Sequence, residues 1–266
     1  DVFITVDAGR LQRAKNSGVL QKIDNPILKN RIPASLRDRE NYWFGLSQRA
    51  RTIIYNKVTL DPTKLSTYED LASPRWKGQL CIRSSDSVYN QSLVASMIEV
   101  NGLEKTESWA RGLVQNFARP PTGGDTDLLK ATAAGQCSIA LANTYYFGRL
   151  INSKITSERK AAQNLAVFWP NQGAGDRGVH VNVSGAGVTK HARNINEAIS
   201  LLEFLVTDES QKWYAEVNNE YPVVEGAEIS KTLESFGSFK ADRINLTILG
   251  VNNPKAVKLM DRAGWR

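Results

Sequence analysis

Strand-like runs alternate with helix-like segments along most of this chain, and this alternation restricts the fold more than any other feature. Short apolar runs separated by helices of roughly 10–15 residues are typical of α/β proteins. The sequence therefore predicts an α/β fold with a largely parallel sheet. The predicted strands are Val2–Val6, Thr52–Tyr55, Gln79–Arg83, Cys137–Ala142, Leu165–Trp169 and Gly185–Thr189.

Two of the intervening segments, residues 91–100 and 195–206, carry apolar side chains at helical spacing. Side chains three and four residues apart lie on one face of a helix, so we expect both stripes to be core. The stripe residues are Leu93, Val94, Met97 and Ile98 in the first segment and Ile195, Ile199, Leu202 and Val206 in the second.

Composition excludes some classes of partner. With 266 residues, 41% hydrophobic and 23% charged, the chain can build one large domain or two moderate ones. No apolar run approaches the ~20 residues that a membrane-spanning helix needs. The formal net charge is +7, but the positive residues are scattered and form no basic tract, so we do not expect a nucleic-acid ligand.

The chain has two cysteines, Cys81 and Cys137, each in a predicted strand. Two are too few for a disulfide scaffold, and they lack the CxxC spacing of zinc or redox sites. If the two strands are neighbours, a disulfide is possible and would fit an oxidising compartment. Two free buried thiols are the alternative.

Catalytic groups are scarce. The two histidines, His180 and His191, are expected in a polar loop and a polar turn, and no GxSxG motif occurs. Ser184–Gly187 contains glycines but lacks phosphate-loop spacing, so we interpret it as a strand entry or hinge. The sequence therefore favours a binding protein, with an enzyme as the alternative of another class.

Tyrosines gather at the ends of two predicted strands. Tyr145 and Tyr146 follow the strand at 137–142, and Tyr89 follows the strand at 79–83. Carboxyl ends of parallel strands form the ligand-binding edge of open α/β sheets, so the three side chains are expected near one ligand. Adjacent residues of a strand point to opposite faces, so both Tyr145 and Tyr146 can reach it only if a helix starts there.

Three uses of these tyrosines stay open on spacing alone. They could pack in the core, stack on a sugar or base, or bind a hard metal ion through phenolate oxygens. Phenolate is a hard anionic donor, and three phenolates would neutralise the charge of Fe³⁺. Because each phenol must lose its proton, metal affinity would weaken as pH falls.

Eight stretches along the chain resemble a known family. They are Asp1–Leu11, Trp43–Arg51, Ile54–Asn56, Trp76–Gly78, Ile82–Ser85, Tyr89–Leu93, Asn143–Tyr146 and Met260–Trp265. In these stretches the chain is similar to the ferric-iron-binding periplasmic proteins of bacterial ABC importers, which are type 2 periplasmic binding proteins. It resembles especially the cyanobacterial branch, which binds iron mainly through tyrosines.

The resemblance implies a two-lobed clamshell that carries Fe³⁺, or Fe²⁺, in the interlobe cleft to an inner-membrane ABC permease. The first lobe would comprise residues 1–51, the second lobe 52–184, and residues 185–266 would return to the first lobe and form the C-terminal helices. The expected protein is a periplasmic monomer, free or lipid-tethered, with iron as cargo and no catalytic cofactor. Carriers of an anion, a polyamine or a sugar are the alternatives.

The resemblance also assigns site residues. Tyr145 and Tyr146 match the adjacent pair that ligates Fe³⁺ in the family, and Tyr89 matches the further tyrosine of the cyanobacterial branch. Arg49 and Arg149 match arginines near the site, where they would offset phenolate charge or hydrogen-bond the phenolate oxygens. A structural ion pair for Arg49 and a surface position for Arg149 are the alternatives.

Two departures from the family pattern concern the ligands. Relatives that use a phosphate carry a Glu-Gln pair where this chain has Val6 and Asp7, so a glutamate ligand is absent and Asp7 is expected to form a turn. The loop Ser84–Asp86 could hold an anion, but we expect it to cap a helix. In the family, a strand-helix unit with another tyrosine precedes the first strand, and the resemblance implies that this unit lies upstream of Asp1.

Overall fold

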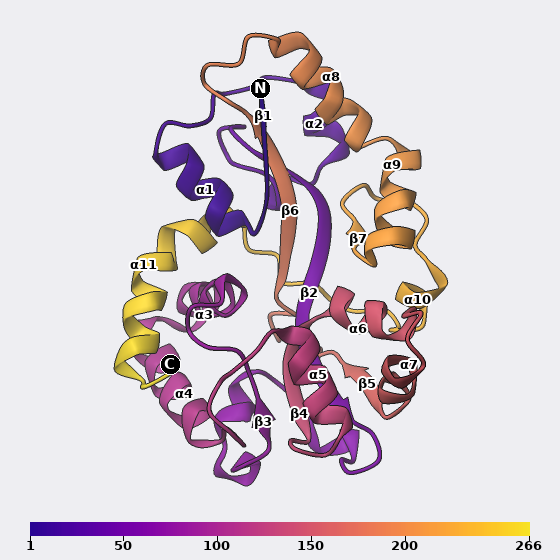
Figure 1. The fold of residues 1–266 in the computed structure, drawn as a ribbon. Coiled ribbons are helices and arrows are strands. Elements are labelled where there is room, and N and C mark those ends of the chain that lie inside the picture. Colours follow the sequence, from indigo (N-terminus) through magenta and orange to yellow (C-terminus); the bar gives the residue numbers. More distant parts are fainter.

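One long strand, β2 (Phe44–Asn56), connects the two lobes of the molecule in the computed structural model, which describes residues 1–266 (Figure 1). The first half of β2 pairs with β6 (Val181–Val188) and β7 (Tyr221–Pro222). Its second half pairs with β4 (Ile139–Asn143) and β5 (Leu165–Phe168). A single strand therefore belongs to both sheets and joins the lobes.

The direction of the strands differs from the prediction. The order is β1-β6-β2-β4-β3, with β1 (Val2–Val6) against β6 and β3 (Leu80–Cys81) against β4. Only β3 and β4 are parallel, so the predicted largely parallel sheet is wrong. Alternation of strands and helices does not encode direction: β4 to β7 each run back alongside β2, and only β3 reaches its neighbour by a long helical crossover.

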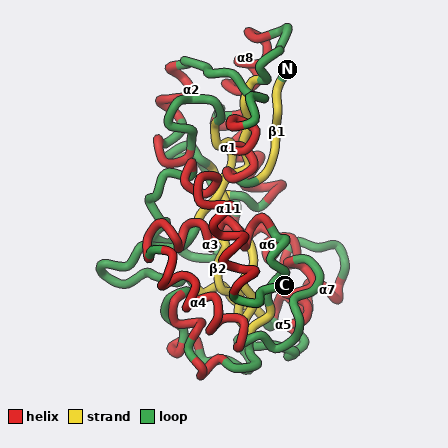
Figure 2. The backbone as a smooth tube through the Cα atoms, turned by 90° about the vertical axis from the view of Figure 1, so that its left-hand side faces the viewer, coloured by secondary structure: helices red, strands yellow, loops and turns green.

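Helices surround the strands, which pass through the centre of both lobes in the side view of Figure 2. The amino-terminal ends of three of these helices, α3, α5 and α6, meet near β4. The helices are α1 (Ala8–Asn16), α2 (Pro26–Arg31), α3 (Val88–Asn101), α4 (Leu103–Gln115), α5 (Asp125–Ala133), α6 (Thr144–Ile151), α7 (Thr156–Gln163), α8 (Ile195–Leu205), α9 (Asp208–Trp213), α10 (Lys231–Glu234) and α11 (Thr247–Arg262).

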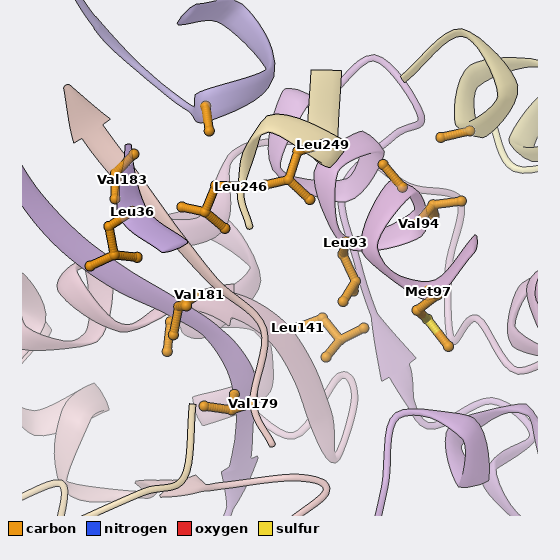
Figure 3. Close-up of a cluster of buried hydrophobic side chains, with 14 of the residues drawn as sticks. Leu36, Leu93, Val94, Met97, Leu141, Val179, Val181, Val183, Leu246 and Leu249 are labelled. Atoms are coloured by element: carbon orange, nitrogen blue, oxygen red, sulfur yellow. The ribbon is translucent and has the colours of Figure 1, made fainter. Parts of the chain in front are cut away.

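The hydrophobic core has a main cluster of 47 buried residues, which extends through both lobes, and a second cluster of 16. Figure 3 shows part of it, where Leu93 and Met97 of α3 face Leu141 of β4. The predicted stripe at 91–100 is confirmed, because all four of its apolar residues are buried. In the other stripe Ile195 is 38% exposed, and only Leu202 and Val206 are fully buried, because α8 covers the outer side of β6. No helix is both long and apolar enough to cross a bilayer.

Cys81 and Cys137 form a disulfide in the second lobe. Cys81 ends β3 and Cys137 lies just before β4, and both side chains are buried. The two strands that lead to the tyrosines are thus joined by main-chain pairing and by a covalent bond. This excludes the alternative of two free thiols.

Candidate metal centre

The chain turns from strand to helix at the tyrosine pair, as the sequence predicts. Asn143 ends β4 in an extended conformation, and α6 begins at Thr144. Tyr145 and Tyr146 therefore lie in the first helical turn, with ring centroids 4.3 Å apart. Tyr145 is buried and Tyr146 is half-buried.

Tyr89 meets this pair from the neighbouring strand-helix unit. It lies in the first turn of α3, which begins at Val88. The hydroxyl of Tyr145 donates a hydrogen bond to that of Tyr89 at 3.1 Å. The parallel pairing of β3 and β4 places both helix starts at the same sheet edge, so the three phenols form one cluster.

The cluster faces a cavity of about 480 Å³ between the lobes. Tyr89, Tyr145, Tyr146 and Arg149 line it from one side. The other walls come from β1, β2, β6 and the segment before β7. These wall residues are Ile4, Thr5, Val6, Leu46, Ser184, Gly185, Tyr214, Asn218 and Glu220.

Burial holds two of the phenols, Tyr145 and Tyr146, in their neutral form. Burial raises the pKa of Tyr145 far above its usual value of 10, and the nearby Tyr89 adds to the effect, while Arg49 opposes it. Burial also raises the pKa of Tyr146. A cation that binds here must displace protons, which a hard trivalent ion does best.

Arg149 lies over the tyrosine pair. Its guanidinium carbon is 5.0 Å from the ring centroid of Tyr145 and 5.6 Å from that of Tyr146. Residues three and four apart on a helix share a face, which explains the contact. The side chain is exposed, as the alternative of a surface position expects, and it also lines the cleft, so its role beside the phenolates stays a prediction.

Arg49 reaches the same cluster from β2 and is 1% exposed. Its Nη1 donates to the Ser184 hydroxyl at 3.0 Å, and its guanidinium lies 6.0 Å from the Tyr89 ring centroid. No carboxylate pairs with it, so the alternative of a structural ion pair is not found. Its Nε and Nη2 are buried without a hydrogen-bond partner, and an anionic oxygen in the cleft would satisfy them.

Arg51 is a second buried arginine at the site, and the sequence analysis missed it. It pairs with Asp125 of α5 at 3.1 Å and donates to Asn90 of α3 and Asn143 before α6. It thereby fastens together the three helix starts behind the tyrosines. The signal was present, because Arg49 and Arg51 are two apart in a strand and lie on the same face.

Asp7 has a larger role than the expected turn. It caps α1 through the Gly9 N–H at 2.8 Å and adopts φ 79°. It is also fully buried and accepts hydrogen bonds from Ser92 of α3 and Asn182 of β6. Asp7 therefore links three elements as well as starting the helix.

Two smaller expectations are wrong. Helix α3 begins after Ser87, and none of the Ser84–Asp86 side chains caps it, so the expected capping is not found. His180 lies in the loop just before β6, as expected, but that position is not polar, because the side chain is 1% exposed and burial lowers its pKa well below 6.5. The serine hydroxyls before α3 are thus not used by that helix.

No group of three or more His, Cys, Asp or Glu side chains is arranged to hold a metal ion. The tyrosine cluster is therefore the candidate centre. A two-lobed α/β fold with donor groups in the cleft between the lobes defines a solute-binding protein of the clamshell type.

The chain belongs to the bacterial extracellular solute-binding protein family, whose sequence profile matches residues 1–241. It is 47% identical to Iron uptake protein A1 of Synechocystis sp. over 266 residues, which is all of this chain and 73% of that protein. These matches confirm the family that the sequence resembles.

Solved structures confirm the two-lobed fold. The structure matches Trichodesmium IdiA (FutA), solved in complex with iron and citrate ligands, with a TM-score of 0.97 and 54% identity, over 100% of this chain and 84% of that chain. The ferric binding protein from Campylobacter jejuni matches with a TM-score of 0.95 and 39% identity, again over 100% and 84%.

Proposed function

We propose that this protein is the substrate-binding component of an iron ABC importer and that it binds Fe³⁺ in the interlobe cleft. The observation that carries the proposal is the meeting of three phenols from two helix starts in that cleft, two of them in direct hydroxyl contact at 3.1 Å. Relatives that are named for iron uptake or ferric-iron binding support the same cargo.

In this proposal Tyr89, Tyr145 and Tyr146 bind the ion as phenolates. Three phenolates balance the charge of Fe³⁺, so the loaded site is close to neutral. Arg49 and Arg149 stand outside the ligand shell, where a guanidinium stabilises phenolate oxygens by charge and by hydrogen bonds. No catalytic cofactor is involved.

The division into lobes follows the shared strand. Residues 1–51 and 185–266 would form the first lobe with the C-terminal helices, and residues 52–184 the second lobe. The second lobe carries all three tyrosines, so it would bind the ion first and the first lobe would close over it. Iron binding would then shift an existing balance between open and closed forms.

The partner of the closed form would be an ABC permease in the inner membrane, and the protein would act as a monomer in the periplasm. The buried disulfide supports an oxidising compartment. The scattered positive charge and the absence of a basic tract give nucleic acid no recognisable binding surface.

An organic ligand stacked on the tyrosines is the alternative binding function. The rings of Tyr145 and Tyr146 already pack together at 4.3 Å, and Arg149 lies over both. This leaves little free ring face for a sugar, a polyamine or a base. All three tyrosines line the cavity, and the hydroxyls of Tyr145 and Tyr89 lie 3.1 Å apart, which favours a ligand bound through oxygen.

Visible absorption tests the proposal. Loading with ferric citrate should give the red to purple charge-transfer band of tyrosinate bound to Fe³⁺, and Tyr145→Phe should abolish or greatly weaken iron binding. The matched control is Tyr55→Phe, which removes the hydroxyl of a buried tyrosine outside the cleft and should bind iron normally. A colourless wild-type protein, or a Tyr145→Phe variant that binds as well as the control, would overturn the proposal.

A further inference from the structure

Glu220 lines the cleft but is not one of the proposed ligands. It is the one carboxylate that lines the cavity of the three tyrosines, and it is only 7% exposed. No Lys or Arg nitrogen lies within ion-pair distance of it. A buried carboxylate without a cationic partner is costly, so its hydrogen bonds and surroundings need an explanation.

The backbone around Glu220 is fixed on both sides. A π-helical turn, Tyr214–Asn218, precedes it, and such turns occur frequently at functional sites. Asn219 then adopts a left-handed conformation with φ 56° and accepts a hydrogen bond from Asn152 at 2.9 Å. Glu220 follows directly and leads into β7, which pairs with β2. The carboxylate is thus held between the tyrosine-bearing lobe and the shared strand.

Two serine hydroxyls donate to this carboxylate. Ser47 of β2 forms one short hydrogen bond, and Ser184 of β6 forms the other at 3.1 Å. The Ser184 hydroxyl has a single proton and donates it to Glu220, so its lone pairs are free to accept. Arg49 uses one of them, with Nη1 at 3.0 Å.

This chain of contacts ends at the tyrosines. The Ser184 contact is the one hydrogen bond of the Arg49 guanidinium, whose Nε and Nη2 are buried and unpartnered beside the Tyr89 ring. If Ser184 were free to rotate, the guanidinium would lose its fixed acceptor and its orientation. The carboxylate therefore acts on Arg49 through the serine and has no direct contact with it.

We propose that Glu220 is a positioning residue for the iron site: through Ser184 it orients the Arg49 guanidinium toward the tyrosine oxygens. This inference rests on the proposed iron function. It assigns to the first-lobe side of the cleft a preformed polar relay, Glu220–Ser184–Arg49, which determines where positive charge meets the phenolates.

Other charged and titratable groups surround the cluster and stay unchanged in the test. They are Asp7 before α1, Arg51 of β2, Arg83 after β3, Asp125 of α5, Arg149 of α6 and Tyr214 of the π-helical turn. The variants that test the proposal change only Glu220, Ser184 and Arg49 and leave these groups in place.

The experiment compares two substitutions of Glu220 in the ferric-loaded protein. A guanidinium near a phenolate oxygen stabilises the donor electrons and raises the energy of their transfer to Fe³⁺. Glu220→Ala removes the acceptor of Ser184, so the charge-transfer band should move to longer wavelength and iron affinity in citrate competition should fall about tenfold. Glu220→Gln retains an oxygen acceptor for both serines and should stay near the wild-type band.

A direct charge effect gives the opposite pattern. If the carboxylate acted only by its charge, both variants would shift the band alike and to shorter wavelength, because both remove a negative charge near the phenolates. That result would overturn the inference. The matched control is Glu216→Ala, an exposed glutamate of the same π-helical turn, which should leave band and affinity unchanged.

Two further variants make the test independent of Glu220 itself. Ser184→Ala interrupts the relay but retains the carboxylate, and it should reproduce the red shift even if Glu220→Ala folds poorly. In an Arg49→Gln background, Glu220→Ala should cause no additional shift, because residues in one chain of contacts are not additive. Full additivity, or a Ser184→Ala band at the wild-type position, would overturn the relay. A colourless wild type would instead overturn the proposed function, and this inference with it.

Discussion

Gly148→Ala probes how the tyrosine helix is held in place. Gly148 lies in α6, two residues after Tyr146, and faces Asn219 of the other side of the cleft. A Cβ at position 148 would be 2.7 Å from the Cβ and 2.9 Å from the Oδ1 of Asn219. Real Cβ contacts are rarely shorter than 3.4 Å, so one of the two elements would have to move by roughly 0.7 Å.

Two opposing effects decide the stability of this variant. Replacing glycine by alanine inside a helix stabilises it by about 1 kcal/mol. Overpacking a closed contact costs about 1–3 kcal/mol. Asn219 cannot move easily, because it is 3% exposed, has a left-handed backbone conformation and is hydrogen-bonded to Asn152. We therefore expect a net loss of about 1 kcal/mol and a displaced α6.

Urea denaturation of the iron-free protein measures the net loss of unfolding free energy. The charge-transfer band of the iron-loaded protein measures the displacement of α6. The double variant Gly148→Ala/Asn219→Gly removes the obstructing side chain at a position whose φ glycine tolerates, so it should recover the native band. A Gly148→Ala protein that gains about 1 kcal/mol, as the helix effect alone predicts, and keeps its band would refute this account of the contact.

Two further predictions concern the disulfide and the phenols. Cys81 and Cys137 are 56 residues apart, so replacing both by alanine should lower the free energy of unfolding by about 4 kcal/mol. Urea denaturation measures this loss, and the wild-type protein with reductant is the comparison. A loss below about 1 kcal/mol would contradict the prediction. Burial raises the pKa of Tyr145 and Tyr146, so both are protonated at neutral pH without iron, and loading at neutral pH should release about three protons for each Fe³⁺ if all three phenols become ligands. Affinity should then fall as pH falls, and competition with a chelator across pH 6–8 that shows no such slope would argue against phenolate ligands.

The fold was partly predictable because apolar runs mark buried strands. The first strand, Val2–Val6, was predicted with its observed bounds. The first half of β2 was missed, since Ser47, Arg49 and Arg51 are polar and become buried only through partners that lie far away in the sequence. The direction of the strands could not be predicted from the hydrophobic pattern either, because a strand buries the same residues beside an antiparallel neighbour as beside a parallel one.

The part of the site that follows from strand ends could be predicted from the sequence. Two tyrosine groups followed two strand ends, and β3 and β4 are the parallel pair for which the rule of carboxyl-edge ligands holds. Glu220 had no such signal: its partners, Ser47 and Ser184, lie 173 and 36 residues away, and a turn and a left-handed residue set its direction. The tyrosines of the second lobe could thus be predicted from local spacing, whereas Glu220 on the first-lobe side could not.

The choice of phenols over carboxylates has a physical reason in this geometry. Three carboxylates at the hydroxyl positions of Tyr89, Tyr145 and Tyr146 would be ionised at neutral pH and would repel one another in the empty cleft. Phenols in the same place stay neutral, because burial raises the pKa of Tyr145 and Tyr146, and the empty cluster is stabilised by the Tyr145–Tyr89 hydrogen bond. Only a cation strong enough to displace those protons gains the full anionic ligand set, and a trivalent ion does so better than a divalent one. In the proposed site, the burial that keeps Tyr145 and Tyr146 neutral would therefore also favour Fe³⁺ over a divalent ion, and Arg49 and Arg149 would reduce the cost of forming the phenolates once that ion arrives.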